Sequence, residues 1–541
     1  MADPVALARL QTLLLPPRQA TLPENFEPPE TTPVVMHSPY SPLSPISSLY
    51  PDGLIDARWV QKHQDLIPSV LVCFHSLTSD PNQATLDDNK IKTDVNNIRT
   101  LLSQSGCRTR LVVILLSDKV TSSVEGIQER LENIRRGGGI EQKALFLVPP
   151  QESQDALEHL ADSTLSAMYG LSLEYYRDMG RHARKKRGRG IAPQPTVPPT
   201  IGTSQTLSLA GWNVRYDFKS ALFAEFRQEM DTAYRSYEQA YEALLGPELL
   251  EVIPSWSPRW NEARLLADIL AVRSLRCLLW NGQYSSAVRR WQSHRDRICD
   301  FIDRRGRGTN NYGWAAWEAR WAEVMAQLIQ KADIAELVSA TPSLFLQPER
   351  GVLGERLQPW ELLHHPGYWH HLASRYHYKR RTLAQAMPED DRRSPSDSPA
   401  SQVASKAFTY DTYMCPDPHE EYPLRHRGID HSSLIVDSLL RARAEFLKRK
   451  QLRFGLEIAV ECARELANAQ DWEHAVELLH PLWNDPFFRA EGWIDINEEL
   501  SWTLRRAASK TGKAKLVVAI DWALLHRSMS QGPLQAPLSL A

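Results

Sequence analysis

The stretch from Trp212 to Leu245 places the tightest limit on what this chain can fold into. Its large apolar residues recur at intervals of three and four, the spacing that keeps side chains on one face of an α-helix. This stripe consists of Phe218, Leu222, Phe226, Met230, Ala233, Tyr237, Tyr241 and Leu244. Gly246 and Pro247 end the pattern, because glycine accepts a left-handed backbone and proline cannot continue the helical hydrogen bonds. The pattern predicts one long amphipathic helix whose aromatic face needs packing partners from elsewhere in the chain.

The opposite face of this predicted helix is charged. It carries Asp217, Lys219, Arg227, Asp231, Arg235, Glu238 and Glu242. Pairs of opposite charge four residues apart stabilise a helix by only a few tenths of a kcal/mol. By itself this face therefore predicts solubility and no particular function.

The same stretch resembles a known family. The resemblance is carried by Trp212, Arg215, Tyr216, Lys219, Phe223, Ala224, Glu225, Phe226, Arg227, Tyr237, Ala240 and Tyr241. This run is similar to the signature helix of the Foie gras region in the family of the eleventh subunit of the TRAPP vesicle-tethering complex, and less dense similarity extends over residues 65–525. Family members usually continue into a long β-rich half, the Gryzun region, which does not follow here. The chain is thus expected to be either part of a longer protein or a short member of the family.

Composition narrows the class of protein. With 541 residues the chain is long enough for two or more domains. Its 63 Lys and Arg against 65 Asp and Glu give a net charge of −2, so no overall field favours nucleic acid. Six widely spaced cysteines suit a reducing compartment, and no apolar run is long enough to span a membrane. We expect a cytoplasmic protein.

Residues 1–58 are rich in proline and serine and show no sustained helical or strand period, so they predict a flexible, disordered arm. Ser-Pro pairs such as Ser38-Pro39 are potential targets of proline-directed kinases, although such pairs are common in arms without regulation.

Residues 59–179 predict a small α/β domain with a parallel sheet. Three short apolar runs, 69–74, 110–116 and 144–148, alternate with helical patterns around 91–102 and 124–134, and a helix over 153–176 follows. Open parallel sheets bind ligands at the carboxyl ends of their strands. No glycine-rich turn follows the first strand, and Asp118 with Lys119 after the second is typical of a solvated loop more than of a phosphate or metal site. We interpret the domain as structural.

Residues 180–206 predict a basic, flexible linker, in which arginines and lysines precede several prolines. Three interpretations remain open: a solvated linker, a patch for anionic lipid headgroups, and a nuclear-import or nucleic-acid patch. No aromatic residues are interleaved for base stacking. The candidates for contact with a membrane surface are Arg184, Lys185, Lys186 and Arg187.

From residue 207 onward, helical patterns repeat. The turns Asn281–Ala287 and Gln470–Ala475 resemble the corner of a tetratricopeptide (TPR) repeat, where an aromatic residue and an alanine three positions later let two helices approach closely. We predict an α-solenoid of TPR-like hairpins over 207–383 and 431–528, which includes a helix at Pro359–Arg381. A disordered insertion over 384–430 separates the two parts, and a disordered tail covers 529–541.

Histidines gather in two places, but neither has a zinc-ligand spacing. They are His364, His365, His370, His371 and His377, and then His419, His426 and His431 near Cys415. The chain also lacks a P-loop, a His-Glu-x-x-His pair and a nucleophile elbow. We therefore predict no catalytic residue, no metal and no cofactor.

The resemblance implies a non-catalytic scaffold subunit of a TRAPP-type complex in ER-to-Golgi and Golgi traffic, which supports a complex that activates a Rab-type GTPase. Its partners would be other TRAPP subunits and, weakly, anionic membrane, with no nucleic acid and no small-molecule substrate. It would lie at Golgi and ER-Golgi intermediate membranes. The candidates for docking are Arg215, Lys219, Arg227 and Arg235. The alternative is an enzyme that uses the α/β domain with the helical repeat as a substrate platform.

Overall fold

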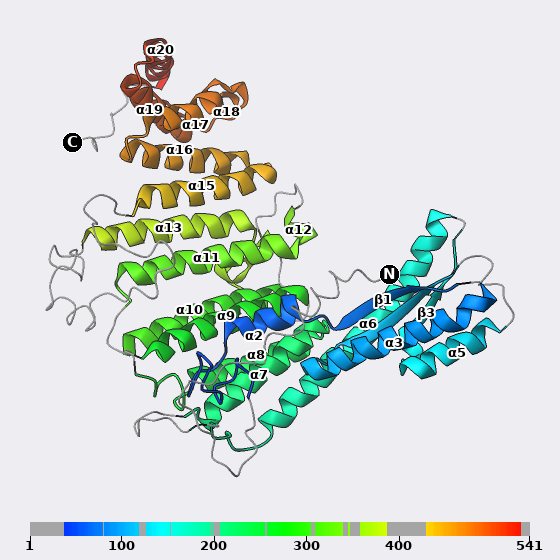
Figure 1. Ribbon diagram of the computed structural model, residues 1–541. Helices are drawn as coiled ribbons and strands as arrows, with labels where there is room; N and C mark the ends of the chain where they lie inside the picture. Colours follow the sequence, from blue (N-terminus) through cyan, green and yellow to red (C-terminus); the bar gives the residue numbers. More distant parts are fainter. Residues whose placement is uncertain are drawn as a thin grey trace. The chain divides into compact units, whose positions relative to one another are not determined.

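The computed structural model describes residues 37–78, 80–117, 126–151, 153–195, 197, 206–254, 257–304, 309–338, 345–346, 357–386 and 429–531 (Figure 1). The chain divides into two compact units, Met1–Cys277 and Leu278–Ala541. Each unit is described by itself.

The first unit contains the predicted α/β domain, with a parallel three-stranded sheet in the described part of the chain. Its strands are β1 (Val70–Ser76), β2 (Arg110–Leu116) and β3 (Leu145–Val148), in the order β1-β2-β3. In register, Val72 pairs with Val112 and Leu115 pairs with Leu147. The central strand β2 is buried from Val112 to Leu115, which explains why it reads as a continuous apolar run.

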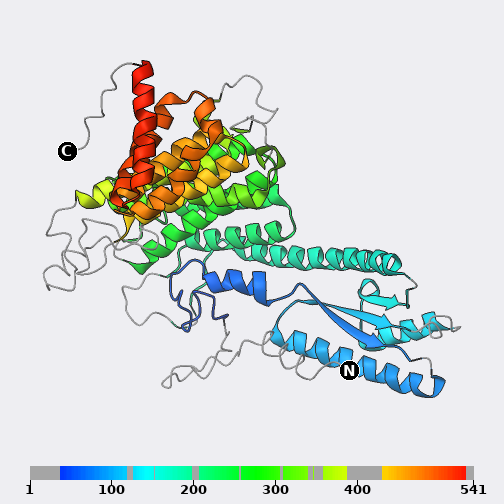
Figure 2. The same ribbon diagram turned by 90° about the horizontal axis from the view of Figure 1, so that it is seen from above.

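Helices cover both faces of this sheet. Helices α3 (Pro81–Ser105) and α5 (Ile127–Gly138) contact each other, as expected when two right-handed crossovers proceed in the same direction along a sheet. Helix α6 (Gln154–Arg187) contacts β1 and β2, and Figure 2 shows it on the side of the sheet opposite α3. The domain core joins α3, α5, α6 and the strands through Val95, Ile134 and Leu171.

Helix α6 is longer than the sequence pattern predicts. A helix ending at Tyr176 and a flexible linker from residue 180 were expected, but α6 continues to Arg187, with Tyr175, Gly180 and Ala183 buried along it. The prediction of a flexible linker is therefore wrong for its first part. The basic residues lie on the last turns of an anchored helix.

The single helix predicted over Trp212–Leu245 is in fact two helices, α7 (Leu209–Phe226) and α8 (Met230–Leu245). The chain turns between them at Gln228, whose φ is +60°. The two helices pack against each other, with the rings of Phe218 and Tyr237 5.9 Å apart. The unit ends within α9 (Pro258–Trp280).

Residues 37–56 do not form the disordered arm predicted for 1–58. The repeat of Ser-Pro pairs makes a chain of tight turns, because the N–H of Ser41, Ser44 and Ser47 each donates to the carbonyl of the serine three positions earlier, at 2.8 to 3.1 Å. Leu43, Leu49 and Leu54 are buried. Two short helical turns follow, α2 (Ala57–Gln61) and η1 (Lys62–Leu66). Residues 1–36 lie outside the described part of the chain.

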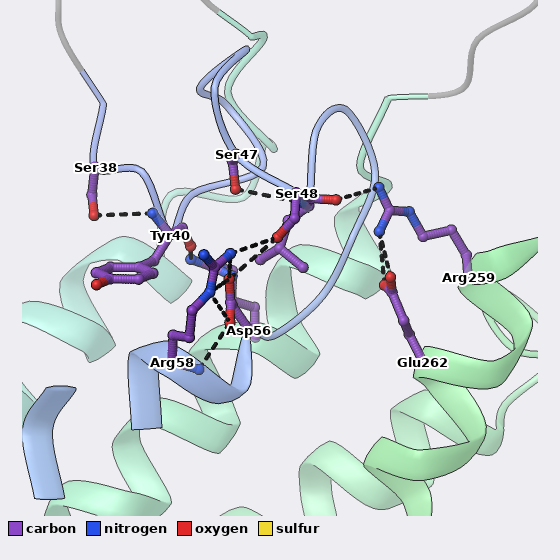
Figure 3. A network of polar contacts seen from close by, with 10 residues as sticks. Ser38, Tyr40, Ser47, Ser48, Asp56, Arg58, Arg259 and Glu262 are labelled. Atoms are coloured by element: carbon purple, nitrogen blue, oxygen red, sulfur yellow. Dashed lines mark hydrogen bonds and ion pairs between the residues drawn. The ribbon is translucent and has the colours of Figure 1, made fainter. Parts of the chain in front are cut away.

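Local and long-range polar contacts hold this segment in place (Figure 3). The Asp56 carboxylate caps α2 by accepting from Arg58 N at 2.8 Å, and it also pairs with the Arg58 guanidinium. Arg259 of α9 reaches the carbonyl oxygens of Ser48 and Tyr50 at 3.2 and 3.0 Å, and its Nε donates to Asp52 at 2.8 Å. The segment is thus part of the first unit's fold.

The second unit is a stack of helices. Its helices are α10 (Tyr284–Arg304), α11 (Tyr312–Ala332), α12 (Ala335–Val338), α13 (Pro366–Gln385), α15 (His431–Lys448), α16 (Leu452–Asn468), α17 (Trp472–Asn484), α18 (Pro486–Ala490), α19 (Ile494–Lys510) and α20 (Ala514–Gln531). Contacts run in sequence from α11 to α13, α15, α16 and α17, and then to α19 and α20, and Figure 1 shows these helices stacked. A small antiparallel pair, β4 (Phe345–Leu346) and β5 (Leu363–His364), and a 3-10 turn η3 (Pro359–Glu361) lie beside it. The predicted fold class, α/β followed by an α-solenoid, is confirmed.

Aromatic and small residues explain how the helices of the second unit pack against each other. The rings of Trp291 and Trp321 stack at 6.2 Å, and each indole N–H donates to the backbone carbonyl of the other residue. Ala287 and Ala475, the alanines of the two TPR-like corners, are fully buried. The sequence predicted that helices approach closely at these corners, and buried alanines leave room for such an approach.

Some predicted boundaries move. The helix predicted to begin at Pro359 begins at Pro366, after η3 and β5. Helix α13 runs to Gln385, past the predicted start of the insertion, and residues 387–428 lie outside the described part of the chain. Helix α20 runs to Gln531, past the predicted start of the tail.

Candidate functional site

Helix α7 carries the most unusual site of the first unit. Ser208 caps it by accepting from Gly211 N at 3.1 Å, and the helix is buried on almost every side. Arg215 and Lys219, one turn apart, line a pocket of about 160 Å³ together with Lys186 of α6 and Arg189, which follows the end of that helix. Its other walls include Trp59, Trp212 and Tyr216, and the turns of residues 37–43. We call this the basic pocket.

Arg215 is 2% exposed and is held by backbone carbonyls. Its Nη1 donates to the carbonyl of Leu54, and its Nη2 donates to the carbonyl of Tyr40 at 2.6 Å. Its Nε has no acceptor among the described residues. Burial lowers the pKa of Arg215, which reflects how unfavourable a positive charge is here.

Lys219 is 8% exposed, and no described carboxylate lies within ion-pair distance of it. Its Nζ lies over the ring of Trp59 at 4.4 Å and over the ring of Tyr216 at 5.2 Å. Burial, and then the charges of Arg215, Lys186 and Lys62, lower the pKa of Lys219 well below its usual value. The side chain is a buried amine that has aromatic neighbours in place of an anion.

The end of α6 completes the pocket. Trp212 Nε1 donates to the carbonyl of Lys186 at 2.9 Å, and Arg187 pairs with Asp217 at 2.6 Å. Arg184, Lys185, Arg187 and Arg189 are exposed, whereas Lys186 is half-buried and turned into the pocket. Burial lowers the pKa of Lys186, as do the nearby charges of Arg189 and Arg215.

The four docking candidates thus have different environments. Arg215 and Lys219 meet in the basic pocket. Arg227 is 7% exposed, pairs with Glu229 at 2.6 Å and donates to the carbonyls of Tyr176 and Phe223 at 3.2 Å. The prediction that these three arginine and lysine side chains form a solvent-facing docking surface is therefore wrong, because α6 and residues 37–61 cover that face. Arg235 of α8 is exposed and stays a docking candidate.

A second charged cluster, whose structural role the sequence did not indicate, joins α7, α8 and α9. Glu225 is 8% exposed, accepts from the Tyr237 hydroxyl at 2.5 Å and pairs with Arg273 and Arg276 at 2.8 and 3.1 Å. Both carboxylate oxygens of Glu225 therefore have a charged or hydroxyl partner. This cluster holds three helices together, and its only sequence signal is a glutamate on an otherwise apolar surface.

The strand ends of the α/β domain offer little chemistry. A pocket of about 440 Å³ lies beside the ends of β2 and β3, and its described lining includes Ser117, Pro149, Pro150 and Gln151 but no charged residue. Asp118 and Lys119 lie outside the described residues.

The histidines of the second unit serve separate local roles. His365 caps α13, His371 contacts Glu461 at 3.2 Å, His377 lies 3.7 Å from Glu323, and His364 stacks on Tyr368. In the described ranges, no group of three or more His, Cys, Asp or Glu side chains is arranged to hold a metal ion. Cys415, His419 and His426 lie outside those ranges.

These features define a class of protein: a small α/β domain joined to an α-solenoid, an architecture in which stacked helices form an extended surface. Two family models match the chain in sequence order, the trafficking protein particle complex subunit 11 N-terminal domain over residues 7–157 and Foie gras liver health family 1 over residues 259–527. Neither is a catalytic family. Helices α7 and α8 lie between the two matched ranges.

The chain is homologous to trafficking protein particle complex subunit 11 over 88% of its length, which confirms the family resemblance drawn from the sequence. The proteins of that name from cattle (Bos taurus), chicken (Gallus gallus) and human (Homo sapiens) are each 22% identical to it over 502 residues. The match covers 40% of each relative, so this chain spans well under half of their length. No helix in the described part of the chain is long and apolar enough to cross a membrane.

Proposed function

We propose that the chain is a non-catalytic scaffold subunit of a TRAPP-type vesicle-tethering complex. The observation that carries the proposal is the homology over 88% of the chain, with both family matches in the same order as the α/β domain and the solenoid. The complex acts in ER-to-Golgi and Golgi traffic and activates a Rab-type GTPase through other subunits. This chain contributes architecture and recruitment, and it lies in the cytoplasm at the surface of Golgi and ER-Golgi intermediate membranes.

The test is affinity purification of the full 541-residue chain from cells, with quantification of the known TRAPP subunits by mass spectrometry. We expect these subunits to co-purify in constant ratio to the tagged chain. A preparation that contains the folded chain without any TRAPP subunit contradicts the proposal.

The exposed face of α8 is the docking surface that we propose within this chain. Asp231, Arg235 and Glu242 are exposed on it, while Tyr237 and Tyr241 are buried on the other side. Arg235→Glu reverses an exposed charge and should reduce the co-purified subunits without changing stability. Lys331→Glu, which reverses another exposed charge on α11, is the matched control. Equal recovery with both variants places docking elsewhere.

The exposed basic residues at the end of α6 also support a weak peripheral contact with anionic membrane. Each Lys or Arg near such a surface contributes about 1 kcal/mol at low salt. The double reversal Arg184→Glu with Lys185→Glu should reduce co-flotation of the chain with phosphatidylserine liposomes at low salt. Unchanged co-flotation would show that these two residues do not contact the membrane.

A further inference from the structure

The charges of the basic pocket are not balanced by the protein around it. Four cationic side chains line it, Lys186, Arg189, Arg215 and Lys219, and no described carboxylate does. The nearby carboxylates lie outside the lining: Asp217 pairs with Arg187 at 2.6 Å, and Asp56, which pairs with Arg58 at 2.7 Å, offsets only part of the charge of Arg215. The pocket therefore brings four basic side chains and no described carboxylate together in one enclosed space.

Two of these cations are more than nine-tenths buried, at 2% exposed for Arg215 and 8% for Lys219. A buried charge is stable only when an opposite charge or good hydrogen-bond partners compensate its lost hydration. The rings of Trp59 and Tyr216 compensate Lys219 in part. The lowered pKa of Lys219 and the open Nε of Arg215 indicate that the compensation is incomplete.

The shape and the donors of the pocket indicate which anion fits. Its volume of about 160 Å³ is below the roughly 300 to 1,000 Å³ of sites for drug-sized ligands, so a compact group fits and a nucleotide does not. Guanidinium and ammonium groups together are the usual partners of phosphate oxygens. Ser38, Tyr40 and Ser41 also line the pocket, and each of these residues carries a hydroxyl group that can donate a hydrogen bond.

We propose that the basic pocket is a binding site for a phosphate monoester. The phosphate belongs either to a small soluble molecule or to the headgroup of a lipid. The second source fits the exposed Arg184, Lys185 and Arg187 on the same end of α6, which would lie against an anionic surface when the headgroup is bound. The site is independent of which subunits dock on the chain.

The experiment uses the full chain in buffer free of phosphate and sulfate. One arm titrates glycerol 3-phosphate against sodium chloride of equal ionic strength, with thermal stability and calorimetry as readouts. The other arm measures co-flotation with phosphatidylcholine vesicles that contain phosphatidylinositol 4-phosphate, compared with vesicles of equal charge that contain phosphatidylserine.

Two variants separate the pocket from its surface. Lys219→Met removes a buried charge while keeping the shape of the side chain, so it should fold at least as stably as the wild type. Lys185→Gln removes an exposed charge from the same helix end that does not line the pocket. We expect Lys219→Met to weaken binding about tenfold or more and Lys185→Gln to leave glycerol 3-phosphate binding unchanged.

Binding of glycerol 3-phosphate that Lys219→Met removes supports a soluble source. Preference for phosphatidylinositol 4-phosphate vesicles that Lys219→Met removes supports the headgroup. If neither probe binds above its control, or if Lys219→Met binds both probes as the wild type does, the proposal is overturned. Loss of TRAPP subunits from the purified chain leaves this test unaffected, so the two proposals fail separately.

Discussion

His365 is a buried residue whose charge state matters for stability. It is 1% exposed, and its Nδ1 accepts from Gly367 N at 3.1 Å as the N-cap of α13. Burial, and then the charges of Arg449 and His364, lower its pKa to about 3. Because this folded-state pKa is below the unfolded value of about 6.5, its contribution to stability is present above pH 6.5 and is lost as the pH falls toward 3.

His365→Asn should therefore reduce the loss of stability in acid. Asparagine is a good N-cap residue and does not titrate, so α13 keeps its cap. Between pH 7 and pH 5 the wild type should lose about 2 kcal/mol more than the variant, as measured by urea unfolding of the second unit. His526→Asn, at an exposed position of α20 in the same unit, is the control and should follow the wild type. Parallel pH profiles for His365→Asn and the wild type contradict this assignment.

Arg227 and Arg235 provide a direct contrast between a buried and an exposed arginine. Arg227→Glu places a negative charge beside Glu229 and removes the donor that Arg227 supplies to the carbonyls of Tyr176 and Phe223, so it should lower the free energy of unfolding by about 2 to 4 kcal/mol. Arg235→Glu should change it by no more than about 0.5 kcal/mol. Denaturation midpoints of the two variants check this. Similar midpoints for the two variants would show that Arg227 is exposed to solvent, as the sequence predicted.

The sequence singled out three residues of the basic pocket but did not predict that they lie together. Arg215 and Lys219 were assigned to a docking face and Lys186 to a membrane patch, yet all three line one pocket. Helical periodicity shows which residues share a face of one helix, but not which distant segment covers that face. Tyr40 lies 175 positions from Arg215, and its carbonyl accepts a hydrogen bond from that residue.

At the scale of elements, the strands were easier to predict than the helix ends. The apolar runs located β1, β2 and β3 to within about one or two residues, because buried parallel strands carry few polar residues. The break between α7 and α8 was missed, since glycine was taken as the signal for a left-handed turn. In this chain Gln228, Asp333, Lys450 and Gln470 take that conformation, with φ between +46° and +63°.

Gln228→Gly should consequently stabilise the first unit. A non-glycine residue in the left-handed region costs about 1 kcal/mol, which exceeds the weak contact that the Tyr169 hydroxyl makes with Gln228 at 3.4 Å. We expect a gain of about 0.5 to 1 kcal/mol in unfolding free energy. Gln239→Gly, in the exposed interior of α8, should lose about 1 kcal/mol. A loss of stability in both variants would show that the turn is not strained.

The α/β domain should bind no dinucleotide or nucleoside triphosphate. No glycine-rich turn follows β1, and the pocket at the ends of β2 and β3 has no charged residue in its described lining. ATP, GTP, NAD and NADP should leave the melting temperature unchanged, whereas a ligand at a hundredfold excess over its Kd adds about 2.7 kcal/mol. A saturable rise with any of the four would favour the enzyme alternative.

At the scale of the whole molecule, composition led to a wrong prediction for residues 37–56, which were expected to be disordered. Proline and serine are enriched both in disordered arms and in tight turns, and a single sequence does not separate the two when the covering surface is distant. Here the distant surface is α7 and α9, which supply Arg215 and Arg259 as donors to the turn carbonyls. The order of domains was predictable, because it follows from local periodicity in each segment.

Removal of residues 1–55 should therefore destabilise the first unit. The truncation takes away the buried Leu43, Leu49 and Leu54 and the carbonyl acceptors of Arg215, which leaves a cation on α7 without partners. We expect a fall in melting temperature of several degrees or insoluble protein. Leu49→Ala in the full chain is the milder variant and should cost about 2 to 4 kcal/mol. Hydrogen exchange gives an independent readout, since the turn amides of Ser44, Ser47 and Tyr50 should be protected in the wild type and unprotected if this segment were a flexible arm.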